Sequence, residues 1–520
     1  MVFAGVVITL KIIKDQNYAT PFLTLFWRAA FIIFYHKRNS MNILISAIQV
    51  IVCIFGLLAV FLSILLFLQF RWPAAAMWGL KVFTSSLSPV FVLVGAAIFV
   101  TGLATGSLFI EVIGAYVILV YLVHYISVTR QPAGEFEKTF SNNWETTFKP
   151  GQKEYFLSHR TSLRLPRVPK PRFDQDITFA TIPGIDRKLL CDVWQPAIST
   201  KPSGVAFIYI HGSAFYFLDK DCGTRPLFRQ LAAQGHVIMD VAHRLAPETD
   251  LVGMIHDIKR AIAWMKSNAE KYAIDTDKVI VAGGSSGGYL ALMTAFTSKE
   301  PEFTPADLEE HDLNVCSVVA LYPATDLEAL YYHTNQHLTT RSVPGKLKKK
   351  VPADMPAWMK KWIGKDLHRL GMDKTLENVG TMPPLMGGHP DECPERYKFF
   401  SPITHVHYDC PPTLLIHGAH DIMAPVKSTR LLYDKLIKEK IQALLHILPQ
   451  ADHAFDLFLT NIAPAAHNAI YDVERFIALI SNRIDEQHAL TTKKTGTSTR
   501  SLARQPVPAF AKAPVGQQQN

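Results

Sequence analysis

The sequence predicts an α/β fold with a mostly parallel sheet, preceded by a helical membrane region. Short apolar segments alternate with helical segments in the second half of the chain, as in α/β proteins. A glycine-rich turn within residues 279–293 joins one of these strands to a helix. The first quarter of the chain contains uncharged runs of membrane-spanning length. With 520 residues the chain exceeds one typical domain, so we expect more than one structural unit.

Residues 1–129 form the predicted membrane region. A transmembrane helix needs about 20 apolar residues, and the uncharged stretch 43–70 meets this requirement. Residues 88–129 predict a hairpin of two further spans that turns near 102–107. We therefore expect about three transmembrane helices. Glu111 lies near the tip of the hairpin, where we expect it at the membrane interface.

Two sets of observations give opposite predictions for the side on which the following domain lies. Basic residues near the N-terminus favour a cytoplasmic N-terminus, which with three spans places the domain outside; they are Lys11, Lys14, Arg28, Lys37 and Arg38. The chain has no N-x-S/T sequon, and its six cysteines show no paired or metal-ligand spacing. These absences favour a domain that faces the cytosol. The short segment 21–35 carries Arg28 and is expected to lie in the interface.

Two polar segments flank the predicted soluble domain. Residues 130–175 carry basic side chains among prolines and are expected to form a linker. Residues 491–520 contain no acid and are rich in Thr, Pro, Ala and Gln, so we expect a disordered basic tail. The net charge of +9 is concentrated in local patches, and no nucleic-acid-binding motif is present. Nucleic acid is therefore not an expected partner.

Residues 176–490 form the predicted α/β domain. It begins with a hairpin of residues 176–181 and 189–194. Apolar residues at spacings of three and four predict an amphipathic helix over 252–270. Six apolar strands follow the hairpin: 205–210, 237–241, 279–282, 318–322, 413–416 and 444–448. In such a sheet, ligands gather at the carboxyl ends of the strands.

The glycine-rich turn GGSSGG presents a serine in the manner of a nucleophile elbow. The pattern G-x-S-x-G fits on Ser285 and also on Ser286. Ser285 is expected at the tip of the turn, because the strand should end at residue 282 or 283. Ser286 should begin the helix, where only its backbone N–H is needed, as a donor to an oxyanion. We therefore predict Ser285 as the nucleophile.

The loop after strand 205–210 has the sequence His211-Gly-Ser-Ala-Phe. A backbone N–H must come within about 3 Å of the negative oxygen that develops during acyl transfer, so small residues suit such a loop. We predict an oxyanion hole from the N–H groups of Gly212, Ser213 or Ala214, together with that of Ser286. His211 accompanies this motif.

A serine nucleophile needs a base and an acid that orients it. Asp421 lies in the loop after strand 413–416, and His453 lies in the loop after strand 444–448. The order serine, acid, histidine on successive strand ends favours Asp421 and His453. Asp452 and Asp456 remain alternative acids.

Together these motifs resemble those of the hormone-sensitive-lipase-like esterases of the α/β-hydrolase superfamily. HGSAF at 211 is similar to the family's HGGG(F/W), AHRLAPE at 242 to its YRLAPE, and GGSSGG at 283 to its GDSAGG. Gly284 replaces the acidic residue beside the nucleophile, and Ser213 and Ala214 replace two glycines of the oxyanion loop. The resemblance covers residues 176–485, and more weakly the N-terminal region resembles anchors of some fungal and bacterial relatives.

The resemblance implies an α/β-hydrolase fold and a membrane-anchored serine hydrolase that cleaves carboxylic esters of small molecules or lipids. Ser285, Asp421 and His453 would form its catalytic triad, and no metal or organic cofactor is expected. An amidase or peptidase of the same fold is an alternative, as is a non-catalytic membrane receptor or scaffold.

The long insertion between the strands ending near residue 322 and beginning at 413 is a predicted lid, residues 325–410. Within it, residues 344–370 combine an apolar stripe at helical spacing with many lysines. Such a helix can cover an active site as a cap or dock on an anionic membrane.

Overall fold

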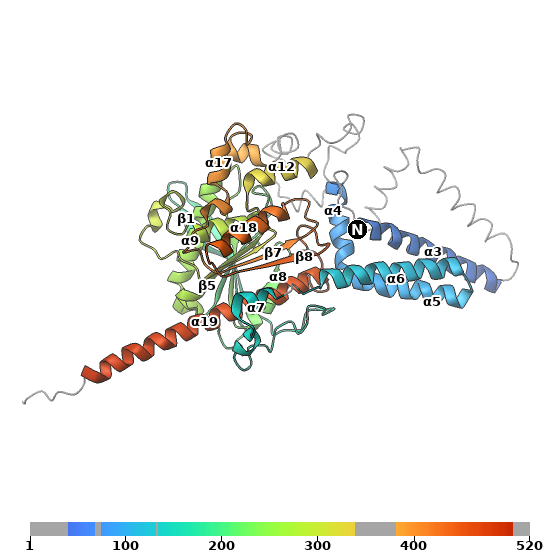
Figure 1. Ribbon diagram of the computed structural model, residues 1–520, viewed down its shortest axis with the longest axis horizontal. Coiled ribbons are helices and arrows are strands. Elements are labelled where there is room, and N and C mark those ends of the chain that lie inside the picture. The colour runs from blue at the N-terminus through green and yellow to red at the C-terminus, as the bar shows by residue number, and fades with distance from the viewer. Residues whose placement is uncertain (1–39, 68–73, 132–133, 338–380, 503–520) are drawn as a thin grey trace, which may run out of the picture.

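The computed structural model describes residues 40–67, 74–131, 134–337 and 381–502 (Figure 1). Two predicted segments lie outside the described residues: the interfacial segment 21–35 and the lysine-rich helix 344–370.

An eight-stranded sheet in the order β1-β2-β4-β3-β5-β6-β7-β8 forms the centre of the domain. β1 pairs antiparallel with β2, and β2 antiparallel with β4, whereas all other pairs are parallel. The strands are β1 (Arg172–Ile182), β2 (Arg187–Gln195), β3 (Ala206–Ile210), β4 (Val237–Ala242), β5 (Val279–Gly284), β6 (Ser317–Leu321), β7 (Thr413–Gly418) and β8 (Ala443–Leu448). The predicted hairpin and the six predicted strands are confirmed.

Helices cover both faces of the sheet. One core joins alternate strand residues such as Ile208 and Val281 to α9, α11 and α18. The other joins residues such as Phe207 and Ile280 to α8 and α19. These helices are α8 (Arg225–Ala233), α9 (Leu251–Ser267), α11 (Ser286–Phe296), α18 (Val426–Lys438) and α19 (Pro464–Leu502). The alternation of the two cores along each strand gives the sheet two buried faces, as expected for parallel strands.

Short helices complete the domain. The predicted helix 252–270 is α9, which is followed by α10 (Ala269–Tyr272). The described part of the insertion contains α12 (Leu327–His337), α16 (Met382–Met386), α17 (Pro394–Phe399) and η6 (Pro402–His405). Three further 3-10 turns are η2 (Thr276–Lys278), η3 (Pro301–Phe303) and η4 (Ala306–Leu308).

The segment 130–175, expected as a linker, packs against the domain over much of its described length. It contains α7 (Glu135–Phe140) and η1 (Trp144–Thr147), and its residues Phe136, Trp144 and Leu157 are buried in the core that includes α19. Arg160 is also buried, with its guanidinium paired with Asp472. Burial of its aromatic side chains stabilises the packing of this segment on the domain. The prolines and charged residues of the segment are typical of a linker, so its composition does not indicate this packing.

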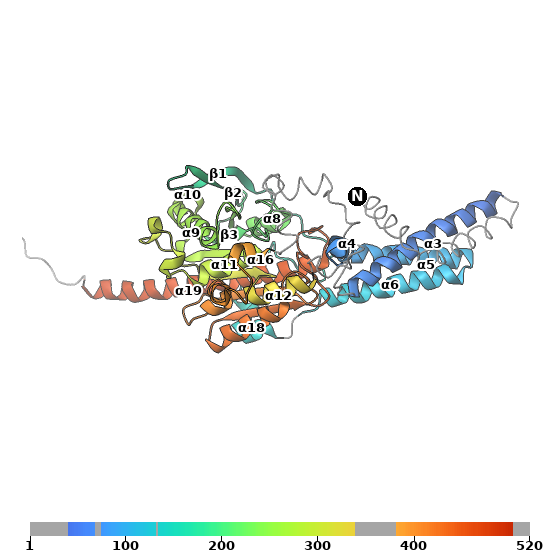
Figure 2. The same cartoon turned by 90° about the horizontal axis from the view of Figure 1, so that it is seen from above.

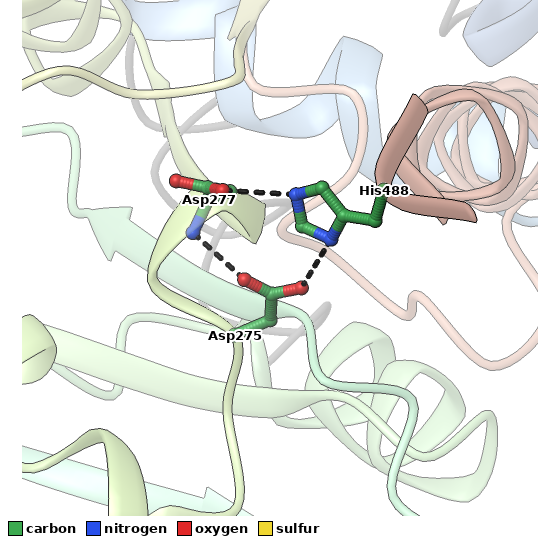
Figure 3. A group of neighbouring side chains, drawn as sticks. All are labelled: Asp275, Asp277 and His488. Carbon is green, nitrogen blue, oxygen red and sulfur yellow. Dashed lines mark hydrogen bonds and ion pairs between the residues drawn. The ribbon is translucent and has the colours of Figure 1, made fainter. Parts of the chain in front are cut away.

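Helix α19 differs from the expectation of a disordered tail, because it continues to Leu502. Once the first turns of a helix have formed, each further residue adds to it at a small cost in free energy. A helix that is packed on the domain can therefore continue into residues whose composition predicts disorder. His488 links the helix to the η2 turn, with 2.9 Å between its Nε2 and Asp277 Oδ2 and 3.6 Å between its Nδ1 and Asp275 Oδ2 (Figure 3). These contacts attach α19 to the η2 turn that precedes β5. Residues 503–520 lie outside the described residues.

Three N-terminal helices project from one end of the domain, opposite to the end at which α19 leaves it (Figures 1 and 2). They are α3 (Ser40–Phe67), α5 (Ser88–Thr105) and α6 (Leu108–Val128). Within the described residues, these three are long and apolar enough to cross a membrane. They match the predicted spans, with the hairpin turn at Gly106 and Glu111 in the first turn of α6.

Glycines allow α5 and α6 to approach closely. A Cβ atom at Gly114 would lie 2.4 Å from the backbone nitrogen of Phe99, and one at Gly95 would lie 2.8 Å from that of Ile118. Small residues at such contacts are typical of helix pairs in membranes. A fourth helix, α4 (Ala74–Ser86), was not predicted and lies where the three-helix bundle meets the domain (Figures 1 and 2).

Candidate active site

Ser285 lies in the sharp turn between β5 and α11. Its backbone has φ 57° and ψ −124°, a conformation that is strained for a residue with a side chain. Neighbouring glycines make the turn possible, because a Cβ at Gly283 would lie 2.4 Å from the backbone of Gly287. Ser286 begins α11, as predicted. The strained turn is the geometry expected of a nucleophile elbow.

The structure brings the three predicted triad residues together. His453 Nε2 lies 2.8 Å from Ser285 Oγ, and His453 Nδ1 lies 2.7 Å from Asp421 Oδ2. Asp421 follows β7 and His453 follows β8, so both side chains come from loops at the carboxyl ends of neighbouring strands. A neutral imidazole with its proton on Nδ1 can accept the serine proton on Nε2.

Asp421 is held as a carboxylate by several donors. Its Oδ1 accepts hydrogen bonds from the N–H groups of Met423 and Ala424, at 2.8 and 2.7 Å. A second imidazole, His417 Nε2, lies 3.1 Å from Oδ2. Burial acts to raise the pKa of Asp421, but His453 and His417 outweigh it and lower the pKa below the usual range. The carboxylate therefore stays charged beside the imidazole.

The two alternative acids have other partners. Asp452 accepts from the backbone N–H of His453 and from Lys81, and Asp456 accepts from the hydroxyl of Tyr322 at 2.5 Å. The structure thus puts Asp421, of the three candidates, within hydrogen-bonding distance of the imidazole Nδ1.

The predicted oxyanion loop packs directly against the nucleophile. A Cβ at Gly212 would lie 3.2 Å from the Cβ of Ser285, so a side chain there would crowd the serine. Ala214 has a positive φ of 45° in the turn that follows. Among the described residues, no hydrogen-bond acceptor contacts the N–H groups of Gly212 and Ala214. Ser286 is the first residue of α11, so its N–H has no acceptor within the helix.

Ser213 differs from its predicted role as a donor. Its N–H donates to Ser286 Oγ at 2.7 Å, and the two hydroxyl oxygens lie 3.0 Å apart. The side chain of Ser286 therefore holds the loop in place, a role that sequence analysis did not give it. Among the described residues, this leaves the N–H groups of Gly212, Ala214 and Ser286 as the candidate oxyanion donors.

We expect Ser286→Ala to lower kcat about tenfold while KM changes little, because the loop that stabilises the oxyanion loses its anchor. The variant leaves the N–H of Ser213 without its buried acceptor. Ser286→Thr, which retains a hydroxyl, is the matched variant and should retain more activity. Steady-state kinetics with a soluble ester measure the effect, and unchanged kcat in Ser286→Ala would contradict the anchoring role.

His211 is the first residue of the oxyanion loop, and its side chain packs in the interior of the domain. It is buried, and its ring packs in a tilted arrangement on that of His243, with 4.5 Å between ring centroids. Burial lowers the pKa of His211 to about 4, so the ring is neutral near pH 7. The described contacts give His211 a packing role at the start of the oxyanion loop.

Sequence analysis missed Tyr322, which was assigned to a strand. The strand β6 ends at Leu321, and Tyr322 turns out of it with φ 38°. Its ring packs on the imidazole of His453, with 4.6 Å between centroids. A Cβ at Gly284 would lie 2.7 Å from the Tyr322 hydroxyl. Glycine at 284, where the resembling family has an acid, therefore makes room for this tyrosine.

Comparison with known families supports a hydrolase fold. A model of the BD-FAE family matches residues 191–365, and a model of the prolyl oligopeptidase family matches residues 371–483. With the sheet order and elbow described above, these matches identify the domain as an α/β-hydrolase fold.

Curated relatives include three proteins of Mycobacterium tuberculosis. The probable carboxylic ester hydrolase LipM is 29% identical over 55% of this chain and 57% of its own length. Esterase LipC is 28% identical over 60% of this chain and 66% of its own length, and esterase LipQ is 26% identical over 62% and 67%. The matches thus span roughly three fifths of this chain and about two thirds or less of each relative.

Solved structures of similar proteins include esterase B from Lactobacillus rhamnosis, with 19% identity and a TM-score of 0.45 over 62% of this chain and 90% of that one. Thermogutta terrifontis esterase 2 matches with 17% identity and a TM-score of 0.42 over 61% of this chain and 96% of that one. In sequence, the chain is similar to bacterial carboxylic ester hydrolases and carries an α/β-hydrolase domain.

Proposed function

We propose that this chain is a membrane-anchored serine hydrolase that cleaves carboxylic esters of small molecules or lipids. Ser285 Oγ attacks the acyl carbon while His453 Nε2 takes its proton, and Asp421 holds the imidazole. The N–H groups of Gly212, Ala214 and Ser286 stabilise the oxyanion. His453 then gives the proton to the leaving alcohol, and water attacks the acyl-enzyme in the same way.

The observation that carries this proposal is the continuous hydrogen-bonded series from Ser285 through His453 to Asp421, at 2.8 and 2.7 Å. A serine at a strained elbow with such a base has the arrangement needed for nucleophilic catalysis. The ester hydrolase relatives support an ester as the substrate class.

The N-terminal helices support the membrane part of the proposal. Large apolar side chains on their outer surfaces are exposed, for example Phe55 at 59%, Leu93 at 70% and Leu108 at 71%. An apolar surface of this kind is unfavourable in water and is suited to hydrocarbon. We propose that α3, α5 and α6 cross the membrane and hold the hydrolase domain at its surface.

An amidase or peptidase is the second candidate, because the prolyl oligopeptidase model matches the region that contains Asp421 and His453. Esters and amides with the same acyl group distinguish the two functions. An esterase should favour the ester far beyond the intrinsic difference in reactivity.

The experiment that tests the proposal uses membranes from cells that express the full chain or its Ser285→Ala variant. A fluorophosphonate probe should label the wild type and spare the variant, and the labelled protein should remain in the membrane pellet after an alkaline wash. Equal labelling of the two proteins, or of neither, would contradict the assigned nucleophile. Release by the wash would contradict the membrane anchor.

A further inference from the structure

Side chains of α4 contact the loop between β8 and α19, which carries His453. Trp78 Nε1 donates to the carbonyl oxygen of His453 at 3.1 Å, and the Trp78 ring packs edge-to-face on Phe458. Ser86 Oγ lies 3.1 Å from the carbonyl oxygen of Phe458 and 2.9 Å from that of Val82, so its one proton is shared between these two acceptors. Helix α4 therefore holds the loop at the histidine itself and again five positions later.

Helix α6 contacts the same loop on the other side of the histidine. His124 Nδ1 lies 3.0 Å from Gln450 Oε1, and His124 Nε2 lies 2.8 Å from Ser85 Oγ of α4. His124 is fully buried. The face of α4 from Trp78 to Ser86 and the last turns of α6 thus form one surface against which the loop from Gln450 to Phe458 is fixed.

Asp452 joins this surface to both of the loops that supply the triad. Its Oδ1 accepts from the N–H of His453 at 2.8 Å and from the N–H of Ile422 at 3.1 Å. Ile422 directly follows Asp421, so a single carboxylate sets the spacing between the acid and the base. Its Oδ2 accepts from Lys81 Nζ of α4 at 2.8 Å.

Charge gives Lys81 a function beyond packing. The side chains of Lys81 and Asp452 are only 7% and 2% exposed, so water contributes little to their solvation. Burial raises the pKa of Asp452, an effect that Lys81 partly offsets and that the nearby carboxylate of Asp421 strengthens. Loss of a buried cation leaves an uncompensated carboxylate that must move or take up a proton. A displaced carboxylate no longer accepts from the N–H groups of His453 and Ile422, and a protonated one accepts from them more weakly.

We propose that Lys81 is a positioning residue for the triad, acting through Asp452, so that the N-terminal helical region is a structural part of the active site as well as an anchor. This inference rests on the proposed function. In this proposal, α4 fixes the distance between His453 and Asp421 through the contact of Lys81 with Asp452. The described contact of Lys81 is with Asp452 and not with the reacting atoms.

The test compares variants of the full chain in detergent or lipid nanodiscs. Lys81→Met should lower kcat for a soluble ester by about ten- to a hundredfold with little change in KM, because a small displacement of the base slows the chemical step. Lys81→Arg, which keeps the cation, should retain more activity. The double variant Lys81→Met with Asp452→Asn should recover most of the loss, since an asparagine Oδ1 can accept from the same two N–H groups without a buried charge.

Lys149→Met is the matched control, because it removes a lysine from a solvent-exposed pair with Asp485 and should leave kcat unchanged. Thermal unfolding of each variant separates folding from catalysis. If Lys81→Met does not fold, the test compares the Asp452→Asn variant with the double variant that also carries Lys81→Met. A kcat of the double variant far below that of Asp452→Asn would overturn the inference.

A kcat of Lys81→Met equal to that of the wild type would overturn the inference and leave the proposed function intact. A double variant with a kcat as low as that of Lys81→Met would have the same consequence. Absence of Ser285-dependent ester turnover in the wild type would overturn the proposed function and the inference together.

Discussion

Ser285→Ala should lower kcat for a carboxylic ester at least about a thousandfold, since the nucleophile and its base act as one unit. The variant should fold normally, because alanine removes one hydroxyl whose described partner is His453 Nε2. The backbone of the elbow is held by other contacts, such as the hydrogen bond from Ser285 N to the carbonyl oxygen of Leu321. Initial rates across substrate concentrations measure the loss.

Ser298→Ala is the control for this variant, because Ser298 lies just after α11 and makes a surface hydrogen bond with Asn314. It should behave as the wild type. If Ser285→Ala kept near-normal turnover while Ser286→Ala lost it, the elbow would be in the other register and Ser286 would be the nucleophile.

Much of this domain can be predicted from sequence because its strands and motifs are each recognised within a short segment of the chain. The strands are apolar runs between turns, and the motifs stand at their carboxyl ends, where strand order brings them together. Ser285, Asp421 and His453 were each predicted from a short motif, and the structure puts His453 within hydrogen-bonding distance of the other two. The uncharged runs likewise predicted α3, α5 and α6, because the length of an uncharged apolar run shows directly whether a helix is long enough to cross a membrane.

The features that sequence reasoning missed depend on contacts between distant segments. Lys81 stands alone at the edge of an apolar run and meets Asp452 from far along the chain. Tyr322 fits the apolar pattern of a strand, but it turns out of the sheet with φ 38°, and Gly284 leaves room for its hydroxyl. In the same way, the donor role of Ser213 was overestimated, since only the folded loop shows its N–H bonded to Ser286.

His453→Ala should reduce kcat about as much as Ser285→Ala, and the double variant should be little worse than either single one. The reason is that the serine hydroxyl is a weak nucleophile without a base at 2.8 Å. A double variant with a much larger loss than each single variant would show that the two residues act independently, contrary to the triad.

Asp421→Asn should leave the fold intact and lower kcat by about a thousandfold or more, because it gives the imidazole the wrong tautomer. Asp421 Oδ1 has two backbone donors, Met423 and Ala424, so the asparagine oxygen should take that place. The amide NH2 then faces His453 Nδ1, which must accept, and the ring proton moves to Nε2. With its proton on Nε2 the ring cannot accept the proton of Ser285.

The comparison variant for this prediction is Asp456→Asn, since Asp456 is a buried carboxylate in the histidine loop whose described side-chain partner is the Tyr322 hydroxyl. Asparagine can still accept from that hydroxyl, so we expect a loss well below that of Asp421→Asn. Circular dichroism and thermal unfolding check that both variants are folded, and kcat is measured with the same soluble ester. Full activity in Asp421→Asn, with loss in Asp456→Asn or Asp452→Asn, would transfer the role of the acid to that residue. A large loss in Asp421→Asn alone would mean that the carboxylate 2.7 Å from His453 Nδ1 sets the tautomer on which the serine depends.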